Sequence, residues 1–324
     1  DEEISKLVSK LGPALENNRP GHALLVGPNG SGKTVVSKWI SQKFLEMAGD
    51  RDADTVHVNC GSIETEYKML ARIINTVTSG SEQDVGRGYS VDDLLLKACN
   101  EIEKLGDTVL LVLDEVGAIS DMNKFLYQMT RPKQDGTYLD DTNVAVIFTG
   151  NQLEFADNLS GANQSKFDGS EIIFDPYDAD ELRDILNHRA EEAFTDQGIT
   201  EGAIHYAAAK AAQRGGDARY GLLMLLEAGE YALALGESPV GDKHVRVGKQ
   251  RRDEDRVSNL LTQLNTNAQL ALVAMLSLRK NGNSKPIGTD IIKEYNRIGS
   301  AFGNTKGRNS VYNYLTDLEQ VGLI

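Results

Sequence analysis

One run of the sequence has the residue types and the spacing needed to hold a phosphate chain. Residues 27–34 read Gly-Pro-Asn-Gly-Ser-Gly-Lys-Thr and fit the pattern G-x-x-x-x-G-K-T. Glycines let successive backbone N–H groups turn toward a phosphate, the lysine ammonium reaches the terminal phosphates, and the threonine hydroxyl suits Mg²⁺. The residues that we expect to bind a nucleotide here are Pro28, Asn29, Gly30, Ser31, Gly32, Lys33 and Thr34. The simpler alternative is an ordinary glycine-rich turn between a strand and a helix.

A pair of adjacent carboxylates, Asp114 and Glu115, follows the apolar residues 110–113. Phosphate-loop ATPases carry a second acidic motif at the end of such a strand. In that position Asp114 would hold Mg²⁺ together with Thr34, and Glu115 would polarise the attacking water. Adjacent acids also occur in ordinary turns, but the apolar strand before this pair favours the catalytic interpretation.

A GTP-binding protein is a rival interpretation of the same residues, because 114–117 also fit the pattern D-x-x-G. That class needs a later Asn-Lys-x-Asp to select guanine. Residues 123–126 read Asn-Lys-Phe-Leu, which lacks the final acid and comes too early in the chain. The sequence therefore favours ATP over GTP.

Two further polar residues are candidates for contacts near the terminal phosphate. Asn151 follows the apolar run 144–148, so its amide would emerge at the same edge of the sheet as the carboxylate pair and orient water. A plain turn residue fits that position equally well. Arg219 opens a helical pattern and would couple the angle of a lid to the nucleotide. A lone arginine at the start of a helix is, however, usually only solvated.

The first half of the chain has the pattern of a parallel sheet covered by helices on both faces. We expect strands at 22–26, 55–59, 108–113, 144–148 and 172–174. Helical spacing of apolar residues occurs between them at 35–47, 65–77 and 92–105. The sequence thus predicts an α/β nucleotide-binding core with a five-stranded parallel sheet.

Apolar runs of strand length stop after residue 176. Helical patterns at 180–194, 201–212 and 220–235 predict an all-helical second domain. The charged stretch 249–256 predicts a surface connector or the start of a linking helix. Three more helical patterns follow at 266–280, 289–298 and 308–321. We therefore expect a third, separate module at the end of the chain.

Charge separates this last module from the rest of the chain. Residues 1–242 carry 21 Lys and Arg against 41 Asp and Glu, whereas residues 243–324 carry 13 against 7. A basic module on an acidic body indicates nucleic acid as the partner of that module. The surplus of acid also fits a protein that stays soluble in concentrated salt, so a halophilic source is one explanation.

Composition argues against membrane, secreted and transition-metal-binding classes of protein. No apolar run approaches the length of a membrane span, and the start Asp-Glu-Glu lacks the features of a signal peptide, so we expect a cytoplasmic protein with no membrane partner. Cys60 and Cys99 lack metal-ligand spacing and are expected to be buried free thiols. The five scattered histidines argue against a transition-metal site.

The basic module has the pattern of a helix-turn-helix, in which each short helix has one apolar face. The apolar positions expected on those faces are Leu270, Val273, Leu276, Ile291, Ile292, Val311, Leu315 and Leu318. The third helix opens with Lys306, Arg308, Asn309 and Ser310, whose groups suit the phosphates and base edges of double-stranded DNA. The alternative is a winged-helix fold used for protein contact.

Taken together and in this order, the motifs resemble those of AAA+ ATPases, and more closely those of the archaeal replication initiators of the origin-recognition and cell-division-control type. The resemblance is carried by residues 58–60, 65–67, 176–182 and 216–219 and by the carboxy-terminal module. It implies an AAA+ core at 1–175, a helical lid at 176–250 and a winged helix at 256–324. It also implies Asn151 as sensor 1, Arg219 as sensor 2 and Tyr177 as a nucleotide contact. The helix at 65–77 is similar to the insertion with which the family contacts origin DNA.

Two departures from the family pattern limit what the resemblance implies. After sensor 1 the family usually reads Leu-x-x-Arg-Val-x-Ser, and its arginine acts on the nucleotide of a neighbouring subunit. Here residues 159–165 read Leu-Ser-Gly-Ala-Asn-Gln-Ser, with Ala162 at the arginine position, and Lys166 lacks the planar fork of arginine. We also expect a fragment, because the sequence stops where the β-hairpin wing would follow and starts just inside the usual amino-terminal box.

The resemblance implies an initiator that uses ATP and ADP with Mg²⁺, hydrolyses ATP slowly, binds origin DNA, and recruits or loads the replicative helicase, with other initiator subunits as further partners. Two alternatives stay open at this stage. One is a DNA-binding regulator that keeps ATP as a structural ligand and loads no helicase. The other is an AAA+ remodeller that acts on proteins.

Overall fold

The computed structural model describes residues 2–16, 21–78, 88–119, 142–150, 171–283 and 285–324, together with Phe125 and Leu139. The chain divides into two compact units, each with its own internal packing. The first unit comprises Asp1–Glu192 and Ala207–Leu222, and the second comprises Ala193–Tyr206 and Leu223–Ile324.

A five-stranded sheet forms the centre of the first unit. Its strands are β1 (His22–Val26), β2 (Ala53–Asn59), β3 (Thr108–Asp114), β4 (Asn143–Gly150) and β5 (Glu171–Ile173). They lie in the order β2-β3-β4-β1-β5, and every neighbouring pair is parallel. The predicted five-stranded parallel sheet is therefore confirmed. Every residue of β3 and β4 is buried, because helices cover both faces of these central strands.

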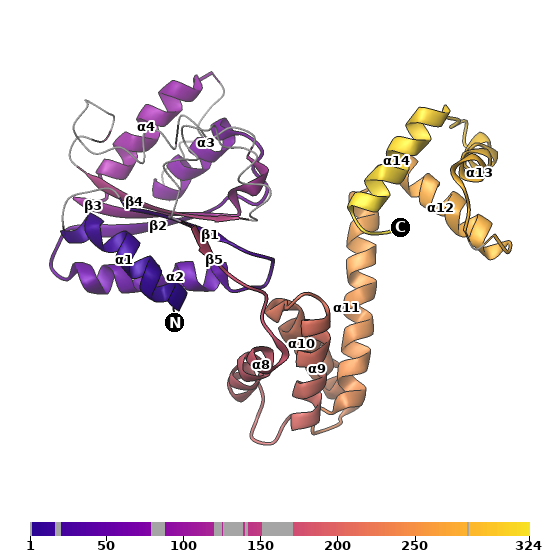
Figure 1. Cartoon of the computed structure of the whole chain (residues 1–324), viewed down its shortest axis with the longest axis horizontal. Helices are drawn as coiled ribbons and strands as arrows, with labels where there is room; N and C mark the ends of the chain where they lie inside the picture. Colours follow the sequence, from indigo (N-terminus) through magenta and orange to yellow (C-terminus); the bar gives the residue numbers. More distant parts are fainter. Residues whose placement is uncertain are drawn as a thin grey trace. The chain divides into compact units, whose positions relative to one another are not determined.

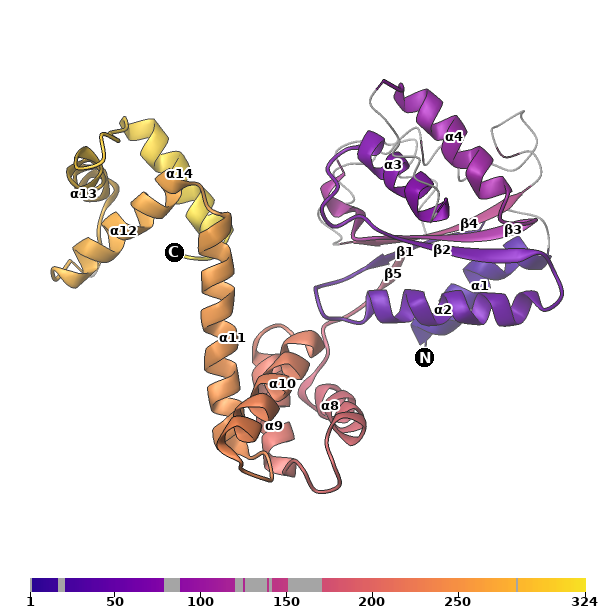
Figure 2. The same ribbon diagram turned by 180° about the vertical axis from the view of Figure 1, so that it is seen from behind.

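Helices lie on both faces of this sheet (Figure 1, Figure 2). One face is covered by α1 (Glu2–Glu16) and α2 (Lys33–Ala48), and the opposite face by α3 (Glu66–Val77) and α4 (Val91–Glu103). A short 3-10 turn, η1 (Val116–Ala118), follows β3. The helix α1 was not predicted, although its buried residues Leu7, Leu11 and Ala14 have helical spacing.

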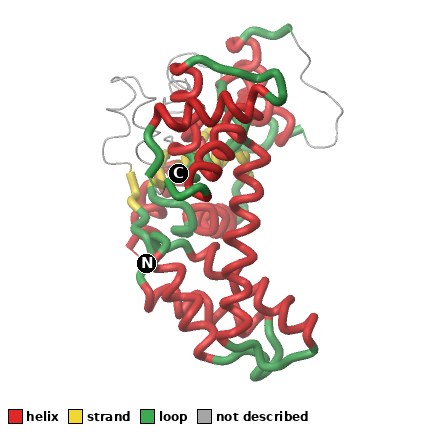
Figure 3. The backbone as a smooth tube through the Cα atoms, turned by 90° about the vertical axis from the view of Figure 1, so that its right-hand side faces the viewer, coloured by secondary structure: helices red, strands yellow, loops and turns green. Residues whose placement is uncertain are grey.

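The chain after β5 is helical, and the strands shown in yellow in Figure 3 belong to the first unit. The helices are α8 (Ala179–Ala193), α9 (Glu201–Gln213), α10 (Ala218–Leu235) and α11 (Asp242–Gln263). The first three match the predicted ranges to within two residues. Residues 249–256 lie inside α11, so the stretch is helical, as one of the two predicted alternatives had it, but the helix begins at Asp242 and not within the stretch. Ion pairs along the helix, such as Lys249 with Asp253 at 2.6 Å, are compatible with its charged sequence.

Three helices form a small cluster in the second unit: α12 (Thr266–Lys280), α13 (Gly288–Ser300) and α14 (Arg308–Gln320). The apolar face predicted for α12 is wrong at Val273 and Leu276, which are 49% and 53% exposed, whereas Leu270 packs against the cluster as predicted. The buried residues of α12 are instead Ala268, Ala271, Ala274 and Met275. Both sides of α12 are apolar, so spacing alone cannot choose between them. Packing against α13 and α14 buries the side with the small residues.

Both cysteines are buried free thiols, as predicted. Burial raises the pKa of Cys60 and of Cys99 to about 12. In the part of the chain that the structure describes, no group of three or more His, Cys, Asp or Glu side chains could hold a metal ion. No helix among the described residues is long and apolar enough to cross a bilayer.

Candidate functional site

The predicted phosphate loop connects β1 to α2. Gly30 and Gly32 have φ angles of 79° and 92°, in the left-handed region that glycine adopts without strain. Ser31 is 2% exposed, and its hydroxyl donates to the carbonyl of Pro28 at 2.9 Å. These features fix a tight loop directly before the first turn of α2, where free backbone N–H groups favour an anion.

Lys33 lies folded back over this loop. Its ammonium donates to the carbonyl oxygens of Gly27 at 2.7 Å and of Pro28 at 2.8 Å. Burial lowers the pKa of Lys33, and the nearby charges of Asp114 and Glu115 act against that shift. The ammonium is thus held at the loop by weak, replaceable acceptors, and phosphate oxygens are stronger acceptors for it.

Asp114 links the loop to the centre of the sheet. Its carboxylate is 2% exposed and accepts hydrogen bonds from the hydroxyls of Thr34, at 2.8 Å, and of Thr149. The backbone N–H of Glu115 donates to the Thr149 hydroxyl at 2.9 Å. Sequence reasoning missed Thr149. The signal was available, because β3 and β4 are parallel neighbours and the residues that directly follow their predicted runs are Asp114 and Thr149.

The two oxygens of Thr34 and Asp114 form a donor set that suits Mg²⁺, which prefers hard oxygen ligands and a nearby phosphate. The loop beside them has the glycines and the lysine that a nucleotide polyphosphate requires. Both predicted groups, a nucleotide and Mg²⁺, therefore fit the residues present.

The Glu115 carboxylate extends from the end of β3 over Gly61, just beyond β2. A Cβ atom placed on Gly61 would lie 2.1 Å from Glu115 Oε2, so a side chain at this position would require the Glu115 carboxylate to move aside. The N–H of Gly61 donates to the side-chain oxygen of Asn59 at 3.0 Å. Glu115 itself has a φ of 62°, a conformation that directs its exposed side chain away from the strand.

The residues predicted near the start of α10 also meet the phosphate loop, within the first unit. A Cβ atom placed on Gly32 would lie 2.5 Å from the Tyr177 hydroxyl, and one placed on Gly30 would lie 2.0 Å from the Asp217 carboxylate. Asp217 caps α10 by accepting from the N–H of Tyr220 at 3.0 Å. Sequence reasoning had no signal for the contact of Asp217 with Gly30, which depends on how the loop and the helix pack.

Arg219 lies in the first turn of α10, two residues after Asp217, and is exposed. Burial raises the pKa of Tyr177, and the nearby carboxylates of Glu181 and Glu3 raise it further. Asn151 and Ala162 lie outside the described residues. The structure thus brings together the loop, Asp114, Glu115 and Tyr177, with Arg219 on an adjoining turn.

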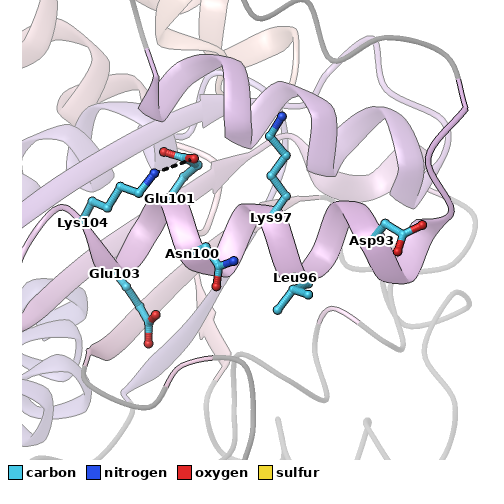
Figure 4. A pocket seen from close by; sticks show the side chains of 7 residues that line it. All are labelled: Asp93, Leu96, Lys97, Asn100, Glu101, Glu103 and Lys104. Atoms are coloured by element: carbon cyan, nitrogen blue, oxygen red, sulfur yellow. Dashed lines mark hydrogen bonds and ion pairs between the residues drawn. The ribbon is translucent and has the colours of Figure 1, made fainter.

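A surface hollow of about 550 Å³ occurs elsewhere in the first unit, on the outward face of α4. Figure 4 shows its lining side chains along this one helix, from Asp93 to Lys104, with the Lys104 ammonium bonded to Glu101. None of the residues of the phosphate loop contributes to this hollow. It is therefore separate from the candidate site.

The residues predicted to contact DNA lie where α13 turns into α14. Arg308 and Asn309 are exposed in the first turn of α14, whereas Lys306 and Ser310 are half-buried. The Arg308 guanidinium lies 5.4 Å from the centre of the Tyr312 ring. This packing directs a cation and an aromatic group to the same helix face.

Comparison with known proteins defines the class of this fold and site. Residues 16–159 match the AAA domain, and residues 183–250 match the Cdc6 AAA+ ATPase-type lid domain. The chain is therefore an AAA+ protein with a Cdc6-type lid, a class that binds nucleotides.

Comparison with individual proteins narrows the family further. The chain is 30% identical to "ORC1-type DNA replication protein 15" of Haloarcula marismortui over 328 residues, covering all of this chain and 80% of the relative. It is 30% identical over 330 residues to "ORC1-type DNA replication protein 10" of Halobacterium salinarum, with the same coverage. A solved structure of the Aeropyrum pernix ORC1 protein in complex with DNA matches with a TM-score of 0.84 and 29% identity, over 99% of this chain and 83% of that one.

The chain belongs to the ORC1-type DNA replication proteins, the archaeal Orc1/Cdc6 family of replication initiators. The resemblance noted from the motifs is confirmed. The family makes the α/β core an AAA+ ATPase-type domain that acts in replication initiation and origin recognition in archaea.

Proposed function

We propose that this chain is an ATP-dependent replication initiator that binds origin DNA. The observation that carries the nucleotide part of the proposal is the hydrogen bond between Thr34 and Asp114, which joins the phosphate loop to the acidic strand end. Membership of the ORC1-type family supports the role in replication and the binding of DNA.

In this proposal Lys33 and the loop N–H groups bind the phosphates of ATP or ADP, and Thr34 and Asp114 hold Mg²⁺. Mg²⁺ held there would neutralise charge on the phosphates. Glu115 takes the proton of the attacking water, and the Thr149 hydroxyl fixes the backbone of Glu115 and the carboxylate of Asp114. Asn151, Tyr177 and Arg219 stay predicted nucleotide contacts.

Hydrolysis is proposed to be slow, because Ala162 stands where the family supplies an arginine to a neighbouring subunit. A planar guanidinium stabilises the charge of the transferring phosphoryl group, and an alanine cannot. ATP would then act as a long-lived ligand that sets the state of the lid.

The DNA contacts are proposed by analogy with the relative that was solved in complex with DNA. Lys306 and Arg308 would contact phosphates, and Asn309 and Ser310 would lie nearest to base edges. We retain the domain limits 1–175, 176–250 and 256–324 as predictions, although α11 runs without a break through residues 250 and 256. The replicative helicase, other initiator subunits and a cytoplasmic location also stay predictions.

The test is to sequence the fragments of genomic DNA that the chain retains in ATP and in ADP, at the salt of its native cytoplasm, because phosphate contacts weaken steeply with salt. We expect a few repeat-bearing fragments, retained more strongly in one nucleotide and lost in the variant Lys306→Ala, Arg308→Ala. Occupancy of promoters alone would select the regulator instead. An absence of enrichment in both nucleotides would favour a remodeller of proteins.

A further inference from the structure

The turn between α13 and α14 is held at its end by one side chain, Asn296. Its amide nitrogen donates to the carbonyl of Lys306 at 3.1 Å, and its amide oxygen accepts from the N–H of Lys306 at 2.8 Å. Both polar groups of one side chain are thus used on the main chain of one residue ten positions later. Such a two-point clamp fixes the orientation of that residue as well as its position.

The other part of the turn is held equally closely. The N–H of Asn304 donates to the carbonyl of Gly299 at 2.8 Å, and its amide donates to Asn267 of α12 at 2.6 Å. A Cβ atom placed on Gly299 would lie 2.0 Å from the carbonyl oxygen of Asn304, so this approach requires glycine. The turn therefore has one well-defined path from α13 to α14.

Lys306 directly precedes Gly307, which is the N-cap residue of α14. Gly307 offers no side-chain cap to α14, and the Asn296 side chain hydrogen-bonds the residue directly before it to α13. The backbone of Lys306 is hydrogen-bonded at both its N–H and its carbonyl, and the residue is half-buried. The Lys306 side chain therefore extends from a backbone position that hydrogen bonds hold in place.

We propose that Asn296 is a positioning residue for DNA binding, which acts through Lys306 and does not itself contact DNA. This inference rests on the proposed function, because it takes the Lys306 ammonium as the group that meets a DNA phosphate. The partner is the sugar-phosphate backbone of a duplex, whatever its sequence. Loss of these two hydrogen bonds leaves the net charge of the protein unchanged but lets the Lys306 backbone move. The contact between the Lys306 ammonium and the phosphate is then lost.

A double-mutant cycle on the full chain tests this. Binding of a duplex of random sequence is measured against salt for wild type, Asn296→Ala, Lys306→Gln and the double variant. Each lost phosphate contact lowers the slope of log affinity against log salt by about 0.9. We expect Lys306→Gln and Asn296→Ala to lower the slope by similar amounts, and Asn296→Ala to have no further effect in the Lys306→Gln background.

Ser277→Ala is the matched control. It removes the hydrogen bond from Ser277 to Glu294, of 2.6 Å, from the same three-helix cluster and leaves the turn intact. This variant should lower stability without changing the salt slope. If Asn296→Ala does not fold, Asn296→Ser takes its place in the cycle, since the shorter hydroxyl cannot make both bonds.

The outcomes separate the inference from the function on which it rests. A lower slope in Lys306→Gln with an unchanged slope in Asn296→Ala would overturn the positioning role alone. Equal losses from Asn296→Ala in both backgrounds would also overturn it, because the residue would then act independently of Lys306. An unchanged slope in Lys306→Gln would overturn the phosphate contact and the positioning role together.

Discussion

Replacement of Gly61 by alanine tests whether the Glu115 carboxylate is the group that activates water. The structure shows that the added Cβ would lie 2.1 Å from Glu115 Oε2, whereas ordinary contacts begin at 3.4 Å. The φ angle of Gly61 lies outside the left-handed region, so alanine is tolerated by the backbone. The backbone of Glu115 is held by Thr149, and the carboxylate must therefore move by rotation of its own side chain.

The size of the effect follows from that displacement. The carboxylate has to withdraw by about 1 Å, and a misplacement of this size can lower a catalytic rate by about 100-fold, or about 2.7 kcal/mol in the activation free energy. The phosphate loop and Asp114 are untouched, so ATP affinity should stay within about twofold of wild type. The change is expected in the rate of hydrolysis and not in binding.

The assay is single-turnover hydrolysis of ATP, with affinity measured separately by titration calorimetry. Gly12→Ala is the matched control, because a Cβ at Gly12 meets no atom within 4 Å. Glu115→Gln is the reference for complete loss of the base, and Gly61→Ala should add nothing in that background. A normal rate in Glu115→Gln would refute the role assigned to Glu115, and a normal rate in Gly61→Ala would refute the need for the observed position of its carboxylate.

Two further predictions concern single hydrogen-bonded groups. Thr149→Val should lower the free energy of unfolding of the first unit by about 2 kcal/mol, because it removes a hydrogen bond to a buried carboxylate. Measured by urea denaturation, Thr149→Ser should retain most of the wild-type stability. Equal losses in both variants would contradict the role of the hydroxyl. Hydrogen bonds from Arg297 and, to a smaller extent, from Ser277 lower the pKa of Glu294 from 4.5 to about 2. Stability from this group is therefore present above pH 4.5 and is lost as the pH falls toward 2. Arg297→Gln should return the pKa toward 4.5 in a carboxyl ¹³C titration, and an unchanged value would show that Arg297 is not the cause.

The sequence was sufficient for the parts of the site that depend on local patterns. A phosphate loop is a short motif in which glycine dihedrals and the lysine are encoded by adjacent residues, and the structure has the predicted loop between a strand and a helix. The strand that ends in Asp114 was equally predictable from the sequence, because central strands of a parallel sheet are continuous apolar runs.

Parts of the site that depend on packing were not predictable in the same way. Asp217 meets Gly30 across 187 positions of sequence, and no local pattern encodes that approach. Thr149 is an ordinary β-branched residue until β3 and β4 are known to be neighbours. The helix α1 was not predicted because Pro13 interrupts its pattern, even though the apolar spacing is helical.

The buried face of α12 shows a different limit. Its sequence is apolar on more than one side, so periodicity gives two solutions of similar quality. The structure buries Ala271 and Ala274 and leaves Val273 and Leu276 exposed. Close packing of three short helices decides this, and close packing is a property of the whole cluster.

The most direct test of the account is calorimetric titration of Mg²⁺ and ATP into the wild-type chain, Lys33→Ala and Lys43→Ala. Lys43 is the control, because it lies on the same helix but pairs with Glu46 and lies over the ring of Trp39. We predict one ATP site in wild type and in Lys43→Ala, and no detectable binding in Lys33→Ala. Wild-type affinity in Lys33→Ala would contradict the nucleotide site and every role derived from it.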